Sequence, residues 1–321
     1  MTRLANHAAR TWELSGYCAM VVMVLILASY PVATRAGVTG SFAPHDLILL
    51  RFGVSALLFL PYLAVQCRAI PRDAWLRGVP LTLFQGAGMA ALAICGLQFA
   101  PANHASALGP GMVPVWVALL GYLLFARRPS IRTVFGAALC AIGVIALASW
   151  SAAGPDPSVL AGDAMFIAAS ALGALYVLQL RNWGIGAIQG AAIVTLYSAL
   201  IVVPWHLWSS SGALWRVAPS ELLWQVLWQG VLIGCIALVA LNHAIARLGP
   251  ERSSAMVALV PALSAALGFL FLGEVPSPAE IAGIFAISAG VSIGASCVYG
   301  GNPASTSASM NRLACRLARP G

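Results

Sequence analysis

Segment 106–149 reads SALGPGMVPVWVALLGYLLFARRPSIRTVFGAALCAIGVIALAS, and segment 253–296, which lies 147 positions later, reads SSAMVALVPALSAALGFLFLGEVPSPAEIAGIFAISAGVSIGAS. Aligned without a gap, the two segments share about 14 of 44 residues, and the matched prolines Pro114 and Pro261 are among them. Self-similarity of this kind in a very apolar chain is typical of membrane transporters that are built from repeats. The stretch therefore predicts a duplicated membrane fold.

The composition restricts the class of protein. The chain has 321 residues, of which 60% are hydrophobic and only 8% are charged, and its mean hydropathy is +0.90. Soluble globular proteins carry about 25% charged residues, so most of this surface must face lipid. A spanning helix needs ~20 apolar residues, so ten helices would use ~200 residues and leave short loops without a separate soluble domain.

The charges and the cysteines exclude several kinds of partner. The net charge of +8 comes from arginine alone, and the arginines stand singly or in pairs between apolar runs. A nucleic-acid-binding protein would gather them on one face, so the expected partner is the lipid bilayer and no nucleic acid. The seven cysteines are scattered and form no CxxC pair, which predicts neither a disulfide framework nor a metal site. No cofactor is expected.

The apolar runs predict ten transmembrane helices. The first run is too long for the apolar core of a secretory signal peptide and is taken as a span. Residues 1–12 are expected to form a cytoplasmic N-terminal tail and residues 299–321 a basic, disordered cytoplasmic tail. The ten spans are 13–35, 46–66, 78–99, 104–126, 131–150, 161–181, 187–208, 223–246, 251–272 and 278–298.

The arginines predict the orientation. With the N-terminus inside, 14 of the 17 arginines fall on cytoplasmic segments, as the positive-inside rule requires. An even number of spans then places both termini in the cytoplasm, and we expect a multi-pass protein of the bacterial inner membrane. Arg35, Arg51 and Arg216 are the exceptions on the outer half.

The whole chain divides into two similar halves, 13–150 and 161–298. Because each half has an odd number of spans, the second half must enter the membrane upside down, and the loop that carries Arg127 in the first half carries Glu274 in the second. The fold class predicted is an all-α integral membrane protein with ten transmembrane helices in two inverted five-helix repeats. Such halves can exchange shapes and give alternating access to a small-molecule substrate near the midplane.

Several motifs carry a resemblance to a known family. The second repeat reads Pro261, then Gly268 to Glu274 and a Gly-rich last helix, while Gly162–Asp163 opens its first span and Arg51–Phe52 lies in span two. This pattern resembles the EamA-like branch of the drug/metabolite transporter superfamily, which implies ten spans and the export of metabolites, often amino acids. The first repeat has Ala126–Arg127 where Gly-Glu is usual, so Glu274 can be structural.

Arg35 and Arg51 are the first candidates for substrate binding. A charge inside an apolar span costs ~2.5–3.5 kcal/mol on insertion scales and usually faces a cavity, where it could bind a carboxylate or phosphate. The alternative is that each arginine reaches the interface or pairs with Asp46.

The other candidates are polar, aromatic or helix-breaking residues. Amides at matched depths can bind substrate or join helices, aromatic rings can line a pocket or pack, and histidines can carry a proton or be hydrogen-bonded. Two prolines are expected to shape the central cavity or a hinge. The substrate-binding candidates are Gln85, Gln229, Tyr30, Tyr176, Trp116 and His243, His104 is a second titratable candidate, and the hinge residues are Pro114 and Pro261.

The leading function is therefore a transporter of small polar organic metabolites, with amino acids or related compounds as the first substrates and export as the direction. A lipid-modifying membrane enzyme is the alternative, although the chain has no HExxH motif and no paired carboxylates, and no enzyme activity is expected. A channel or a membrane scaffold is the other alternative. A monomer is the simplest expectation for the assembly.

Overall fold

The computed structural model describes residues 2–125, 129–148, 156–209, 213–248 and 256–298, and the regular structure within these residues is helical. The helices are α1 (Thr2–Thr39), α2 (Pro44–Leu49), η1 (Leu50–Val54), α3 (Ser55–Gln66), α4 (Arg72–Gln85), α5 (Ala87–Phe99), α6 (Ala102–Leu108), α7 (Val113–Phe125), α8 (Ile131–Ala148), α9 (Pro157–Asn182), α10 (Ala187–Ser209), η2 (Ala213–Arg216), α11 (Pro219–Gln225), η3 (Val226–Ile236), α12 (Ala237–Leu248), α14 (Val260–Leu272) and α15 (Pro278–Val298).

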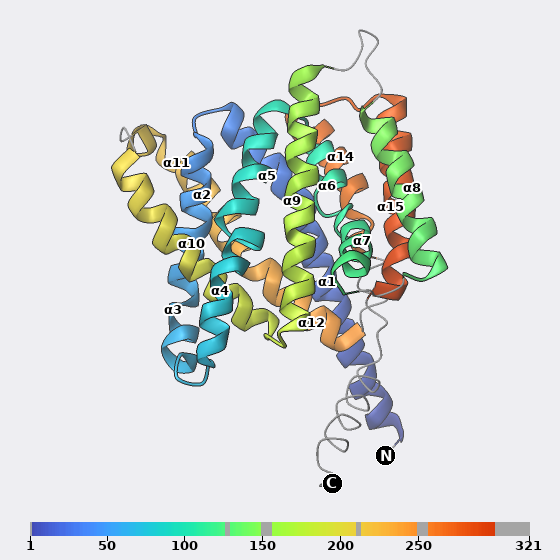
Figure 1. Cartoon of the computed structure of the whole chain (residues 1–321), viewed down its shortest axis with the longest axis horizontal. Coiled ribbons are helices and arrows are strands. Elements are labelled where there is room, and N and C mark those ends of the chain that lie inside the picture. Colours follow the sequence, from blue (N-terminus) through green and yellow to red (C-terminus); the bar gives the residue numbers. More distant parts are fainter. Residues whose placement is uncertain (1, 126–128, 149–155, 210–212, 249–255, 299–321) are drawn as a thin grey trace.

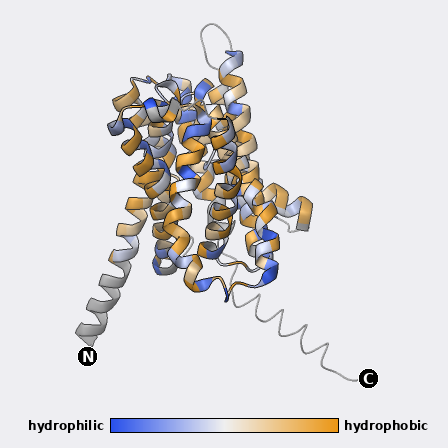
Figure 2. Cartoon of the chain, turned by 90° about the vertical axis from the view of Figure 1, so that its left-hand side faces the viewer, coloured by the Kyte–Doolittle hydropathy of each residue, from blue (hydrophilic) through white to orange (hydrophobic). Residues whose placement is uncertain are grey.

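The described helices are those of a multi-pass membrane protein. Hydrophobic residues make up much of every helix (Figure 2), and many large apolar side chains are exposed on the bundle; those of Val65, Leu76 and Phe271 are more than 70% exposed. Helices satisfy their own backbone hydrogen bonds, so this surface can face lipid. Five segments within the described residues are long and apolar enough to cross a membrane: Leu14–Thr39, Pro44–Gln66, Arg72–Phe99, Pro157–Leu180 and Ile188–Trp208.

Shorter apolar helices occupy most of the remaining predicted ranges, so the all-helical prediction is confirmed while the count of ten spans stays a prediction. We call the end of the bundle where α1 finishes at Thr39 and α9 begins at Pro157 the upper end (Figure 1). The opposite end, where α3 finishes at Gln66, is the lower end. The start of α1 and the finish of α15 both lie toward the lower end (Figure 1).

Several helical segments are interrupted where glycine or proline occurs. Gly86 separates α4 from α5, and its neighbours leave no room for a side chain, because a Cβ atom there would lie 2.2 Å from Ser198 Oγ. Segments η1 and η3 are π-helical, a geometry often found at functional sites. Pro261 lies in the first turn of α14, where a missing N–H is tolerated. Pro114 is the second residue of α7, and its side chain lies outside the described part.

Helices α8 and α15, which close the two sequence repeats, pack against each other through matched glycines. A Cβ atom on Gly136 would lie 2.5 Å from the carbonyl oxygen of Gly290, and one on Gly143 would lie 2.6 Å from that of Gly283. Because Gly283 and Gly290 are the repeat mates of Gly136 and Gly143, each contact is the mate of the other. Reciprocal contacts of this kind are the mark of a two-fold relation, and the order of the residues makes the helices antiparallel.

A second pair of contacts follows the same relation between other helices. Ser55 Oγ donates to the carbonyl oxygen of Gly230 at 2.8 Å, and the mate of this serine, Ser198, accepts from the backbone N–H of Ala87 at 3.1 Å. Ala87 follows Gly86, which is the mate of Gly230. Ser198 thus contacts the interrupted helix of the first repeat and Ser55 contacts η3 of the second, so the two copies are interleaved rather than side by side.

Candidate functional site

A cavity of about 110 Å³ lies among helices from both halves of the chain. The first half contributes η1, the start of α3 and the end of α4, and the second half contributes α9, α10 and η3. The lining residues are Arg51, Phe52, Ser55, Gln85, Tyr176, Ala191, Val194, Thr195, Ile233 and Gly234. Three of the predicted substrate-binding residues are therefore brought together here.

Arg51 supplies the charge of this cavity. Its Nη1 donates to Tyr30 Oη at 2.8 Å, and its guanidinium carbon lies 5.1 Å from the centre of the Tyr30 ring. Within the described residues, no carboxylate lies within 4.0 Å of the Arg51 guanidinium. A guanidinium can bind a carboxylate through two parallel hydrogen bonds. The cavity thus offers a cation that is held in place and is free to neutralise an anionic group.

Gln85, Tyr176 and Thr195 give the cavity its other polar groups. Gln85 is the last residue of α4 before the break at Gly86, and its amide offers two donors and an acceptor. Tyr176 is 9% exposed and closes the α9 side. Val194, the repeat mate of Arg51, lies on the same cavity. The cavity is therefore cationic on the first-repeat side and apolar at the matched place of the second.

The repeat mate of Gln85 has a different position. Gln229 is fully buried, and its Nε2 donates to Thr34 Oγ1 at 2.8 Å and to Gln225 Oε1 at 3.4 Å. Gln225 in turn donates to the carbonyl oxygen of Ala33 at 2.8 Å. These bonds join η3 and α11 to α1. Gln229 therefore joins helices, which is the second of the two roles expected for a glutamine inside the membrane.

Trp116, His243 and Pro261 are not among the described residues that line the cavity. Trp116 packs against the apolar core beside Val113, and its indole N–H is buried without a hydrogen-bond partner among the described residues. His243 Nε2 lies 3.4 Å from Ser15 Oγ, which joins α12 to α1. Pro261 lies in the first turn of α14 and is not among the residues that line the cavity. Pro114 is the second residue of α7, and its place relative to the cavity lies outside the described part.

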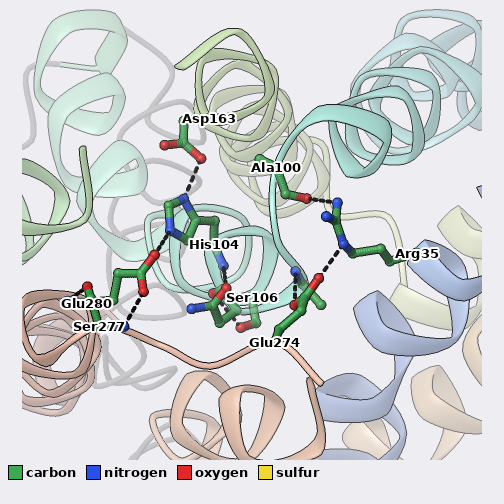
Figure 3. A network of polar contacts seen from close by, with 10 residues as sticks. Arg35, Ala100, His104, Ser106, Asp163, Glu274, Ser277 and Glu280 are labelled. Atoms are coloured by element: carbon green, nitrogen blue, oxygen red, sulfur yellow. Dashed lines mark hydrogen bonds and ion pairs between the residues drawn. The ribbon is translucent and has the colours of Figure 1, made fainter. Parts of the chain in front are cut away.

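Arg35 belongs to a polar network at the upper end of the bundle (Figure 3). It forms an ion pair with Glu274, and its Nη1 donates to the carbonyl oxygens of Leu97, at 2.8 Å, and Ala100. Its expected alternative partner, Asp46, instead accepts a hydrogen bond from the backbone N–H of Ala43 at 3.0 Å. Arg35 therefore joins α1 to the end of α5 and to the segment that follows α14.

His104 is the centre of the second part of this network. Its Nδ1 lies 2.8 Å from Asp163 Oδ1 and its Nε2 lies 3.0 Å from Glu280 Oε1, as Figure 3 shows. Glu280 also accepts from the backbone N–H of Ser277 at 2.6 Å. The histidine is 2% exposed, so α6, α9 and α15 are joined by a buried chain of charged or polar groups.

The two parts of the network meet at the start of α6. The backbone N–H of Ala102 donates to Glu274 Oε2 at 3.0 Å, two residues before His104. Asp163, Glu274 and Glu280 lie at or near the ends of the predicted spans, and the sequence predicts no binding role for them. The available signals were Gly162–Asp163 and Gly273–Glu274, which are motifs of the family that the sequence resembles.

The Arg35–Glu274 pair can be tested by a double-mutant cycle. Each side chain is 20% exposed, so solvent screens the pair only in part. We expect a coupling free energy of about 1 to 2 kcal/mol between Arg35→Ala and Glu274→Ala, measured by unfolding of the purified protein in detergent.

The exposed pair Arg77–Asp73 is the matched control. Its atoms are 3.8 Å apart on one helix, with side chains 40% and 76% exposed, and we expect a coupling of about 0.3 kcal/mol. Equal coupling in the two cycles would contradict a partly buried ion pair between Arg35 and Glu274.

Comparison with known proteins points to transport. Over 280 residues, which are 83% of this chain and 88% of the relative, the chain is 26% identical to a probable terminal-alkyne amino-acid exporter of Streptantibioticus cattleyicolor. Over 138 residues, 40% of this chain and 43% of the relative, it is 31% identical to the threonine/homoserine exporter RhtA of Escherichia coli K12. A solved crystal structure superposes with a TM-score of 0.60, covering 88% of this chain and 96% of that chain at 21% identity, which shows the fold alone.

A family model also matches the chain. The model of the EamA-like transporter family matches twice, over residues 14–149 and 160–294. The two matches correspond to the two halves that the sequence repeat predicts, and together they cover most of the chain. The protein belongs to the EamA-like transporter family.

Proposed function

We propose that this protein exports small polar metabolites that carry a carboxylate, with amino acids as the first class, across the bacterial inner membrane. The observation that carries the proposal is Arg51, an arginine that lies on a cavity between the two repeats with no carboxylate beside it among the described residues. A substrate carboxylate would pair with the Arg51 guanidinium, and Gln85 and Thr195 would bind the other polar groups of the substrate. The names of the two exporters above support the same substrate class.

The proposed mechanism is alternating access between two inverted five-span repeats, 13–150 and 161–298. The reciprocal glycine contacts of α8 with α15 and the interleaved serines support an inverted two-fold relation. The positive-inside rule predicts that the lower end, where α1 begins and α15 finishes, faces the cytoplasm and that the upper end faces outside. The unit that works is expected to be a monomer, because both repeats lie in one chain.

In this scheme the upper network closes the external side of the cavity. It connects the start of α6 and the segment after α14 with α1, α9 and α15 through Arg35, Glu274 and His104. Opening toward the outside would require these charges to separate and to be solvated by the entering water. The described conformation is therefore assigned to an outward-closed state of the transport cycle.

The experiment is counterflow in proteoliposomes that contain purified protein. Vesicles loaded with homoserine should accumulate labelled homoserine, and external threonine should compete. The decarboxylated analogue, 3-aminopropan-1-ol, keeps the amine and the hydroxyl, and it should compete at least about tenfold less well because it lacks the group that Arg51 binds. Equal competition by threonine and 3-aminopropan-1-ol would overturn the proposal. So would a panel of amino acids of which none is transported above the level of protein-free vesicles.

A further inference from the structure

Two histidines and an aspartate meet at the upper end, outside the cavity and outside the network around His104. His45 and Asp46 lie in the first turn of α2, and His206 lies near the end of α10. His45 Nε2 and His206 Nε2 lie 3.6 Å and 3.7 Å from the same oxygen, Asp46 Oδ1. One donor atom from each of the three residues lies within 4.8 Å of the others.

These distances suit a metal ion better than hydrogen bonds. The two separations from Asp46 exceed a hydrogen bond, so the atoms converge without bonding one another directly. Ligand atoms about 2.0–2.1 Å from a tetrahedral ion are about 3.3 Å apart, and a small inward movement of His45 and His206 would reach that spacing. Two imidazoles and a carboxylate are donors that zinc and its neighbours in the first transition row accept.

The surroundings hold two of the three donors in position. Asp46 and His206 are 2% and 3% exposed, and the second oxygen of Asp46 accepts a hydrogen bond from the backbone N–H of Ala43 at 3.0 Å. This bond orients Oδ1 toward the imidazoles, as outer-shell hydrogen bonds orient metal ligands. His206 Nδ1 is buried and has no hydrogen-bond partner among the described residues, so no hydrogen bond at this nitrogen compensates for its burial.

The site also has a route for an ion. The side chain of His45 is 37% exposed, so the cluster is open to solvent at one side. Trp205, whose ring centre lies 6.0 Å from that of His45, is 53% exposed, and Trp208 on the same helix is 92% exposed, as expected of an aromatic belt at the membrane interface. An ion would therefore arrive from the aqueous phase at the upper end without crossing the apolar core.

We propose that His45, Asp46 and His206 bind a divalent transition-metal ion, zinc first, with water in the fourth position, and that the bound ion joins the two repeats. The cluster bridges α2 of the first repeat and α10 of the second, and the continuations of these helices carry Arg51 and Thr195 on the central cavity. An ion at this place fixes the external ends of two cavity helices. The sequence alone predicted no metal site, because these histidines are 161 positions apart.

The test is zinc binding to the untagged protein in detergent by calorimetry. We expect one zinc ion per chain, affinity at least about tenfold lower in His206→Ala and Asp46→Asn, and no change in His7→Ala, which removes an imidazole at the far end of α1. Zinc should raise the unfolding temperature of the wild type but not that of His206→Ala. Cobalt in place of zinc should give the intense visible absorption of a tetrahedral ion.

A third variant, His45→Ala, separates loss of zinc binding from misfolding, because it alters only the exposed side of the cluster. This variant should unfold at the wild-type temperature without metal and still lose the zinc-dependent rise. Equal zinc affinity in the wild type, His206→Ala and His45→Ala would overturn the site. This binding test does not depend on the proposed transport function, so the two can fail separately.

A consequence for transport follows if both proposals hold. Zinc outside proteoliposomes should slow homoserine counterflow by the wild type and leave His206→Ala unaffected, because the ion holds α2 against α10. Binding at the site without any slowing would overturn the clamping role of the ion.

Discussion

Replacing Arg51 by alanine is expected to lower the rate of amino-acid counterflow by about 30- to 150-fold. The variant loses the charged hydrogen bonds to the substrate carboxylate, which contribute about 2 to 3 kcal/mol, and 1.4 kcal/mol corresponds to a factor of ten. The loss should appear mainly in the KM for carboxylate substrates. The measurement is initial counterflow over a range of homoserine concentrations in proteoliposomes that contain equal amounts of protein.

Three further variants separate substrate binding from a structural effect of Arg51. Arg51→Lys keeps the charge but not the planar pair of donors, and should fall between wild type and alanine. Tyr30→Phe removes the hydroxyl that accepts from Arg51 Nη1, and should raise KM with little change in stability. Arg216→Ala, at an exposed arginine away from the cavity, is the matched control. Wild-type counterflow by a folded Arg51→Ala protein would exclude Arg51 from the substrate site.

A second large effect, on the free energy of unfolding, is expected when Gly143→Ala adds one methyl group between α8 and α15. A Cβ atom on Gly143 would lie 2.6 Å from the carbonyl oxygen of Gly283 and 2.7 Å from Ile287 Cγ1, so the helices must separate. Overpacking a close interface costs about 1 to 3 kcal/mol, and small residues are what let membrane helices approach this closely. We expect Gly143→Ala to lower the free energy of unfolding by about 2 kcal/mol.

The two-fold relation predicts that the repeat mate behaves in the same way. Gly290→Ala would place its Cβ atom 2.6 Å from the carbonyl oxygen of Gly136 and should be destabilising by a similar amount. Gly121→Ala is the control, because its Cβ atom would meet only Leu178, at 3.7 Å. Thermal unfolding in detergent compares the three variants. If Gly143→Ala were as stable as Gly121→Ala, α8 and α15 would not pack as described.

The sequence by itself predicted the helical membrane fold, the two repeats and part of the site. Hydropathy and periodicity are local properties, so runs of apolar residues indicate helices without knowledge of their neighbours. The spacing of 147 residues between the copies identified Gly143 and Gly290 as equivalent before any packing was known. Arg51 could be predicted as a candidate binding residue because a charge inside an apolar span is energetically costly and usually faces a cavity.

The tertiary structure decided which of these residues meet. Gln85 lines the cavity while its mate Gln229 is fully buried against Thr34, and the two lie in different local structure, since α4 ends at Gln85 whereas Gln229 lies inside the continuous segment η3. The partner of Arg35 is Glu274, which is 239 positions away, rather than the nearby Asp46. Such contacts depend on the rotation and depth of each helix in the bundle, which are set by packing between helices and not by the hydropathy of any one of them.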